Sequence, residues 1–401
     1  MRYSGPRWAI LLLAERCAAL VLGPVRRRGT LRYAIMMVPR AVTVVWLSVW
    51  LVACRAGDES ATVASAGSHA ALQEVDIGGT AADTVLMMPT AATRLSNGVI
   101  VIADPFVPAI RYFSPDGKLI RSVGRKGEGP GEFEVPRWLR QCGTDSVFVW
   151  DAGQMRMTVL DGAGSMVRQF KIESVGGALE CSRRGVLVAI GPPLSGRAPS
   201  LRERRVSGPL VILDREGRAA GSFGVVPHWE FRPLGRFTSL AVSDSLLFMG
   251  TADSAWVDVL SLQGTHLGGI SVGGAPREPT ERHYDLAIEA AANQFANRGD
   301  RETAKAMERQ MFPEPPEALP PYAGLFIDPD EVLWAVTSFA GDAVTVLQAV
   351  TATGEKLGEV RLPRYIQVFE VGRGYVLGAY ETEEGVPHVA LYRLPTLEGG
   401  T

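Results

Sequence analysis

Hydrophobic and polar positions follow one another over short stretches from Leu72 onward. Ile110 and Tyr112, for example, alternate with Arg111 and Phe113. A period of two residues is typical of strands whose side chains point to the two faces of a sheet. The 44 Gly and 26 Pro residues supply the turns between such strands. This pattern predicts an all-β body built from many short strands.

The strands recur as a unit, in which an apolar strand, a polar turn, a second apolar strand, a turn with glycine and a last strand follow one another. The turn glycines mark the register, and the first four recur roughly every 50 residues. They are Gly117, Gly164, Gly217, Gly264 and Gly354. Six units end near residues 124, 170, 224, 273, 362 and 394. Four short strands in each such unit predict a six-bladed β-propeller over residues 72–395.

The sixth unit supplies only three strands, at residues 366–371, 375–380 and 388–394. One strand, LQEVDI at residues 72–77, precedes the first unit and has no blade of its own. A closed ring leaves no blade incomplete, and unpaired strand edges invite aggregation. We therefore expect residues 72–77 to form the outer strand of the last blade and to close the ring.

An insertion at residues 276–321 separates the fourth unit from the fifth. Apolar positions at helical spacing predict helix over residues 278–311, with a break at 297–300. Thr280 is the expected cap of the first helix and Asp300 that of the second. A proline-rich return, PEPPEALPP, follows at residues 313–321. The insertion is either a lid over the open face of the propeller or a helical brace on its rim.

Residues 41–53 are uncharged and strongly apolar, and Arg40 precedes them. The run is shorter than the 20 or so residues that cross a membrane, and its length is typical of a signal peptide. It ends in Leu51-Val52-Ala53-Cys54, which resembles the bacterial lipobox. That resemblance implies a diacylglyceryl group on Cys54 and cleavage before it, so residues 1–54 form an extension and lipoprotein signal. An uncleaved membrane anchor is the alternative.

The segment at residues 55–71 is rich in Ala, Ser and Gly and predicts a flexible linker. The long stretch before the apolar run indicates that translation starts at Met36 or Met37. We expect an exported protein that is lipid-anchored to the bacterial envelope, at the outer membrane.

The charge and the cysteine content limit which partners and cofactors we expect. After Cys54 the chain holds 33 basic and 42 acidic residues, and this acidic body argues against nucleic acid as a partner. The sequence has no C-x-x-C pair and no H-x-x-H, and we expect no cofactor and no metal. Cys142 and Cys181 follow the first strands of neighbouring units. They are a possible disulfide, provided that their Cα atoms come within about 7 Å.

Blades one and two carry the segments VIVIAD, IRYFSPDGKLIRSVG and GRKGEGPGEFEVP, the last at residues 124–136. These segments resemble the NHL-repeat-like six-bladed β-propeller proteins of bacteria. The resemblance covers about 80 residues well and is weaker beyond them. It implies a six-bladed propeller that is often a lipoprotein and seldom has a known activity.

Loops on a rigid scaffold carry function, and we place five segments on the open face of the propeller: 104–109, 124–136, 151–156, 225–236 and the insertion. Arg125 and Lys126 are candidates for an anionic ligand, although the glycines and proline around them favour a structural turn that sets the angle between blades one and two. Arg156 ends the third of these segments. Asp104 and Asp151 could bind a metal or a polar ligand near the channel mouth, but such residues more often cap turns. Phe133 is expected to wedge between blades.

His228, Trp229 and Arg232 are expected in the loop after the third blade. An aromatic side chain beside a cation suits a sugar or a peptide, and packing between blades is the alternative.

The expected propeller, the expected anchor and the absence of a G-x-S-x-G motif, a P-loop and a G-x-G-x-x-G after a strand favour a non-enzymatic binding or scaffold protein with no catalytic residues. We expect it to be a monomer. Its partner would be a peptide, a glycan or another envelope protein. The alternative is an enzyme of lactonase or lyase type with a metal in the channel, for which Glu180 and Asn97 are lone candidates. A structural role in an envelope complex is a third hypothesis.

Overall fold

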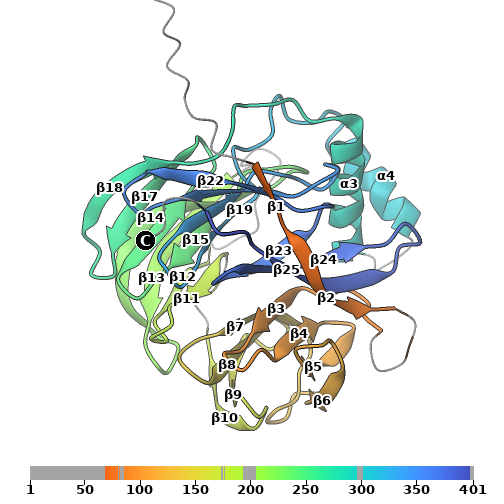
Figure 1. Ribbon diagram of the computed structural model, residues 1–401, viewed down its shortest axis with the longest axis vertical. Helices are drawn as coiled ribbons and strands as arrows, with labels where there is room; N and C mark the ends of the chain where they lie inside the picture. The colour runs from red at the N-terminus through yellow and green to blue at the C-terminus, as the bar shows by residue number, and fades with distance from the viewer. Residues whose placement is uncertain are drawn as a thin grey trace, which may run out of the picture. The chain divides into compact units, whose positions relative to one another are not determined.

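The computed structural model describes residues 68–79, 81, 85–172, 175, 177–192, 205–295 and 301–397. Six antiparallel blades form a propeller, as the sequence predicted (Figure 1). The first three blades run in chain order from the first strand to the fourth. They are β3 (Ala91–Arg94), β4 (Ile100–Asp104), β5 (Val107–Phe113) and β6 (Leu119–Val123); β7 (Pro136–Gln141), β8 (Ser146–Asp151), β9 (Arg156–Asp161) and β10 (Met166–Lys171); and β11 (Leu179–Cys181), β12 (Leu187–Ile190), β13 (Arg205–Leu213) and β14 (Ala219–Glu230).

Of the other three blades, the fourth also has four strands in chain order. The fifth gains a fifth strand from the N-terminal side at its outer edge, and the sixth, which has three strands of its own, takes its fourth strand from that side. They are β15 (Ser239–Val242), β16 (Leu246–Gly250), β17 (Trp256–Ser261) and β18 (His266–Ser271); β19 (Gly324–Ile327), β20 (Leu333–Val336), β21 (Val346–Val350) and β22 (Lys356–Arg361) with β1 (Ser68–Ala70); and β23 (Gln367–Gly372), β24 (Tyr375–Glu381) and β25 (Pro387–Arg393) with β2 (Leu72–Gly78).

The hydrophobic core is divided among the interfaces between blades. In the described residues, each of six buried clusters combines side chains of two neighbouring blades. Phe133 is fully buried between Ile110 of the first blade and Leu139 of the second, as expected of a wedge. The second strands are almost wholly buried, whereas the outer strands β6 and β10 have exposed positions.

The ring closes as predicted. Strand β2 pairs antiparallel with β25 and completes the last blade. One strand was not predicted, because β1 lies within the stretch expected to be linker and pairs in parallel with β22. The N-terminal segment therefore holds the outer edges of two neighbouring blades. Residues 1–67, with Cys54 and the apolar run, lie outside the described residues.

Helices α3 (Glu281–Phe295) and α4 (Arg301–Met311) lie between β18 and β19, at the predicted place between the fourth and fifth blades. Thr280 caps α3 through its Oγ1, which accepts the His283 N–H at 3.3 Å, and Asp300 lies outside the described residues. Arg277 and His283 both bind Asp342 in the β20–β21 loop. The insertion is thereby fastened to the fifth blade, and this favours a brace. No helix among the described residues is long and apolar enough to cross a membrane.

Candidate functional site at the channel mouth

The first strands of the six blades surround a central channel, which opens into a cavity at each end. The cavity at the beginnings of these strands has a volume of about 580 Å³. We call it the channel mouth. Residues of all six first strands line it, among them Ala91, Trp138, Leu179, Ser239 and Gly324. It therefore lies on the face where the connections between blades arrive.

Aromatic side chains dominate the channel mouth. They are Trp138, Trp150, Trp229, Phe237, Phe326 and Phe369. Trp229 is 39% exposed and Phe237 is 37% exposed, although more than half of the aromatic side chains that the structure describes are buried. Exposed aromatic side chains that line a concavity are typical of a binding site.

An ion pair lies deeper in the channel. Arg140 of β7 and Glu180 of β11 approach to 3.3 Å between Nη2 and Oε1, and both side chains retain some exposure to the channel. Burial raises the pKa of Glu180, and the positive charge of Arg140 opposes part of that effect. The pair therefore presents a donor and an acceptor side by side without net charge.

A smaller cavity of about 300 Å³ occupies the other end of the channel. One of the carboxylates that line it, Glu370 of β23, accepts hydrogen bonds from the Thr93 hydroxyl, the Arg94 N–H and the Tyr375 hydroxyl. Burial, together with the charge of Glu370, raises the pKa of Tyr375. The carboxylate oxygens of Glu370 thus already accept hydrogen bonds from groups of the protein itself.

A third cavity, of about 830 Å³, separates the insertion from the fourth blade. We call it the insertion cleft. The return at residues 313–321 forms one wall, and Glu230, Arg236 and Asp253 line the other side. Arg236 lies between the two carboxylates and donates to Glu230 at 2.9 Å and to Asp253 at 2.6 Å.

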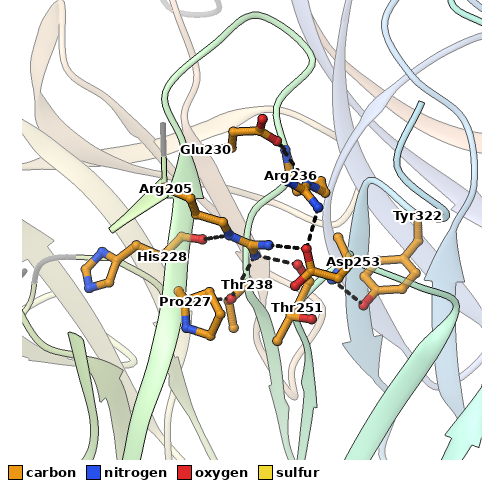
Figure 2. A network of polar contacts seen from close by, with 10 residues as sticks. Arg205, Pro227, His228, Glu230, Arg236, Thr238, Thr251, Asp253 and Tyr322 are labelled. Carbon is orange, nitrogen blue, oxygen red and sulfur yellow. Dashed lines mark hydrogen bonds and ion pairs between the residues drawn. The ribbon is translucent and has the colours of Figure 1, made fainter. Parts of the chain in front are cut away.

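Figure 2 shows that Arg205 is the centre of this polar network. Its guanidinium donates to the His228 carbonyl at 2.9 Å and to Asp253 Oδ1 at 2.7 Å. Thr238 donates to the Pro227 carbonyl at 2.6 Å, and the Tyr322 hydroxyl accepts the Ala252 N–H at 3.0 Å. The network thereby joins the third blade, the fourth blade and the start of the fifth.

The predicted residues Asp104 and Asp151 are fully buried turn anchors in this structure. Asp104 accepts the N–H groups of Met87, Met88 and Phe106. Asp151 accepts those of Glu134, Val135, Gly153 and Gln154. Neither residue lines one of the three cavities. Asn97 accepts the Val99 N–H in an exposed turn.

The predicted loop at residues 124–136 holds itself together. Arg125 pairs with Glu132 at 2.7 Å, and Arg156 donates to the carbonyls of Glu128, Gly129 and Glu132. Lys126 is exposed. These contacts favour the structural turn over an anion site.

His228 and Trp229 lie in strand β14 and not in a loop as expected, because β13 begins early enough to pair with this part of the chain. His228 is 1% exposed, and neither ring nitrogen has a hydrogen-bond partner among the described residues. Burial lowers the pKa of its imidazole, and the nearby Gly191 carbonyl opposes part of that effect. Both residues line the channel mouth, whereas Arg232 lines the insertion cleft.

Cys142 and Cys181 form a disulfide, with Cα atoms 5.9 Å apart. It joins the ends of β7 and β11, close to the Arg140–Glu180 pair.

The sequence analysis missed Arg140, Glu370, Phe237, Arg205, Arg236 and Asp253. It named only Glu180 and Asn97 as candidates for a channel site, although Arg140 and Glu370 stand on the first strands β7 and β23. The signal available was their position on first strands, which line the channel of a propeller. No comparable signal pointed to Arg205 or Asp253.

The fold and cavities define a six-bladed propeller with an open channel mouth. Similar solved structures include a candidate exported protein from Bacteroides fragilis, with 10% identity, coverage of 81% of this chain and 94% of that one, and a TM-score of 0.46. A gluconolactonase from Xanthomonas campestris has 13% identity, coverage of 83% and 99%, and a TM-score of 0.43. Virginiamycin B lyase from Staphylococcus aureus has 10% identity, coverage of 80% and 98%, and a TM-score of 0.41.

At these identities and scores the similarities carry no argument about activity. No family model matches the chain, and no curated protein is similar to it in sequence.

Proposed function

We propose that this chain is a ligand-binding protein of the bacterial envelope, which takes a peptide, a glycan or a partner protein at the channel mouth. One observation carries the proposal: Trp229 and Phe237 expose aromatic surface at the rim of a cavity of about 580 Å³. A ligand that covers exposed aromatic surface of this kind removes it from water, and this lowers the free energy of the complex.

The contacts of the two carboxylates on the first strands favour binding over metal-assisted catalysis. Glu180 is paired with Arg140, and Glu370 accepts three hydrogen bonds from the protein. Within the described part of the chain, no group of three His, Cys, Asp or Glu side chains converges as metal ligands. A lactonase or lyase site would need such convergent ligands.

The proposal includes a lipid anchor on Cys54, supported by the apolar run and the lipobox-like residues before it. The mass of the mature N-terminal peptide tests it. A diacylated peptide that begins at Cys54 is expected, and its absence from the Cys54→Ser variant is the control. An unlipidated chain that begins at Met1 would contradict the anchor.

Capture from the envelope fraction of the producing cell tests the binding site. The double variant Trp229→Ala/Phe237→Ala is expected to retain less than about a tenth of the material bound by the natural chain, since aromatic contacts dominate such interfaces. Trp256→Ala is the matched control, because Trp256 is 50% exposed but lines none of the three cavities. Equal capture by the double variant and the natural chain would refute the proposal.

A further inference from the structure

The charged side chains that line the channel mouth do not balance. In the described part of the chain they are Arg137, Arg140 and Glu180, and the last two pair with each other. His228 is neutral near pH 7, because burial lowers the pKa of its imidazole. The side chain of Arg137 is exposed and has no ion pair or hydrogen bond with the described residues. The mouth therefore presents one unpaired positive charge, although the chain after Cys54 is acidic.

Arg137 stands at a β-bulge. The pairing of β7 with β8 shifts between Pro136 and Trp138, so Arg137 is an extra residue without a partner in β8. Neighbouring residues of a regular strand point to opposite faces of the sheet, yet Arg137 and Trp138 both line the channel mouth. Bulges redirect side chains in this way and are frequent beside functional sites. The bulge thus brings the unpaired cation to the same cavity as the aromatic side chains.

The mouth also contains buried polar atoms that have no hydrogen-bond partner among the described residues. They are Ser239 Oγ, Trp138 Nε1 and both ring nitrogens of His228. Trp138 Nε1 lies near Glu180, whose pKa it helps to lower, but outside hydrogen-bonding geometry. Buried polar atoms ordinarily have partners, and each of these side chains can donate a hydrogen bond. They indicate a ligand that brings acceptor oxygens into the mouth.

The part of the wall that carries Trp229 is held in place by the protein itself. Arg205 donates to the His228 carbonyl at 2.9 Å, and Thr238 donates to the Pro227 carbonyl at 2.6 Å (Figure 2). These bonds fix the end of β14, in which Trp229 lies. A preformed surface loses little conformational entropy when a ligand covers it.

The shape of the mouth favours the end of a chain over a segment that passes through. All six first strands line it, so it has walls on every side. At its inner end Arg140, Glu180 and Phe326 also line the smaller cavity, and they therefore stand between the two cavities. A chain end enters such a space from one side, whereas an internal segment would have to fold back on itself.

The first strands also offer main-chain hydrogen bonds. Each first strand is the innermost strand of its sheet and pairs on one side only, as β7 does with β8. The other edge faces the channel, and a peptide can bond to such an edge through its own N–H and C=O groups. A peptide therefore fits the mouth better than a glycan.

We propose that the channel mouth binds the C-terminal end of a peptide or protein, with the free carboxylate on Arg137 and an apolar last side chain against the aromatic wall. This inference rests on the proposed binding function and adds the ligand class and the cation that recognises it. A carboxylate and Arg137 each carry one charge and can form two parallel hydrogen bonds. A phosphate dianion would leave one charge without a partner in a cavity that also holds Glu180.

Calorimetric titration of the natural chain with short peptides tests the inference. The probes are acetyl-Gly-Ser-Gly-Ser-Phe and acetyl-Gly-Ser-Gly-Ser-Leu, each as the free acid and as the C-terminal amide. At least one free acid is expected to bind, about tenfold tighter or more than its amide, because the amide lacks the charge that pairs with Arg137. Added salt is expected to reduce this difference, since ions screen an exposed charge.

Two further probes separate the sources of the carboxylate. Phenylpropanoic acid has a carboxylate and a ring but no amide groups. The amidated peptide acetyl-Gly-Ser-Gly-Glu-Phe carries its charge in a side chain instead of at its end. Both are expected to bind about tenfold more weakly than the free acid that ends in Phe, because each lacks one part of the proposed recognition.

Variants assign recognition of the carboxylate to Arg137. Arg137→Gln is expected to lower the affinity for the free acid to that for the amide, and Arg137→Lys is expected to retain part of the difference. The amide controls for folding, because a distorted mouth would bind both forms more weakly, as is expected of Trp229→Ala. Arg282→Gln is the matched control, because Arg282 of α3 is also exposed and lines none of the three cavities.

Four results would overturn the inference: no free acid binds, free acid and amide bind equally, Arg137→Gln leaves their difference unchanged, or either of the two further probes binds as tightly as the free acid that ends in Phe. The proposed binding function would survive any of them if envelope capture still depends on Trp229 and Phe237. Loss of that dependence would remove both proposals.

Discussion

Asp104 and Asp151 show how one side chain fixes the join between two blades. Each ends the second strand of its blade and accepts N–H groups from two places, the turn that follows and the connection that enters the blade. A buried carboxylate that accepts several backbone N–H groups satisfies donors that would otherwise be buried without partners. These residues therefore stabilise the connections that enter the blades, and neither lines the channel mouth.

Asp151→Ala is expected to lower the free energy of unfolding by about 3 kcal/mol, because it leaves several buried N–H groups without an acceptor. Denaturant titration measures the loss. Asp161→Ala is the control, since Asp161 accepts the Ala163 and Ser165 N–H groups in an exposed turn, and about 1 kcal/mol is expected there. Equal losses in the free energy of unfolding would show that burial does not increase the contribution of the carboxylate to stability.

At the scale of the element, strand β14 explains why His228 and Trp229 were expected in a loop. Gly221, Gly224 and Pro227 interrupt this 12-residue strand and are typical of turns. The ladder continues through them because bulges in the β13–β14 pairing absorb the irregular positions. Pro227 is tolerated because β14 is an outer strand, where a missing N–H costs little.

The insertion is a second element whose position rests on few residues. Although burial raises the pKa of Asp342, hydrogen bonds from Arg277, the Phe339 N–H and His283 lower it to about 2. A carboxyl whose folded pKa lies below its ordinary value of 3.8 stabilises the fold above about pH 4. That stabilisation is lost as the pH falls towards 2.

Acidification from pH 4 to pH 2 is therefore expected to cost the natural chain about 2 kcal/mol more than it costs Asp342→Asn. Urea unfolding at several pH values, followed by the fluorescence of the tryptophans, measures the difference. Asp330→Asn is the control, because Asp330 is half-exposed and pairs with Arg373 away from the insertion. Parallel pH profiles for the natural chain and Asp342→Asn would contradict the assigned role.

At the scale of the whole molecule, the ring is held by contacts between distant parts of the chain. Strand β2 completes the blade of β25, and β1 adds to the neighbouring blade. The Cys142–Cys181 disulfide joins the second and third blades beside the channel. Each of these contacts restricts blades that also meet through their buried clusters and through polar pairs such as Arg140–Glu180.

Reduction of the disulfide is expected to lower the free energy of unfolding by about 4 kcal/mol, from the entropy of a loop closed over 39 residues. Thermal unfolding with and without dithiothreitol measures it. The Cys142→Ala/Cys181→Ala variant should show no response to the reductant. A natural chain that is equally insensitive would rule out this contribution.

The sequence by itself determined the blades, the closing strand and the helical insertion, because alternation, turn glycines and helical spacing are local patterns. It also placed Thr280 at the start of α3, since a helix cap depends on adjacent residues.

Only the tertiary structure decided which side chains meet. Arg140, Glu180 and Glu370 come from three blades, and Arg205 and Asp253 from two. Their meeting depends on ring closure and on the direction of each strand, which no local pattern encodes. The three-residue strand β1 is too short to show alternation, so its pairing with β22 is likewise a property of the closed ring.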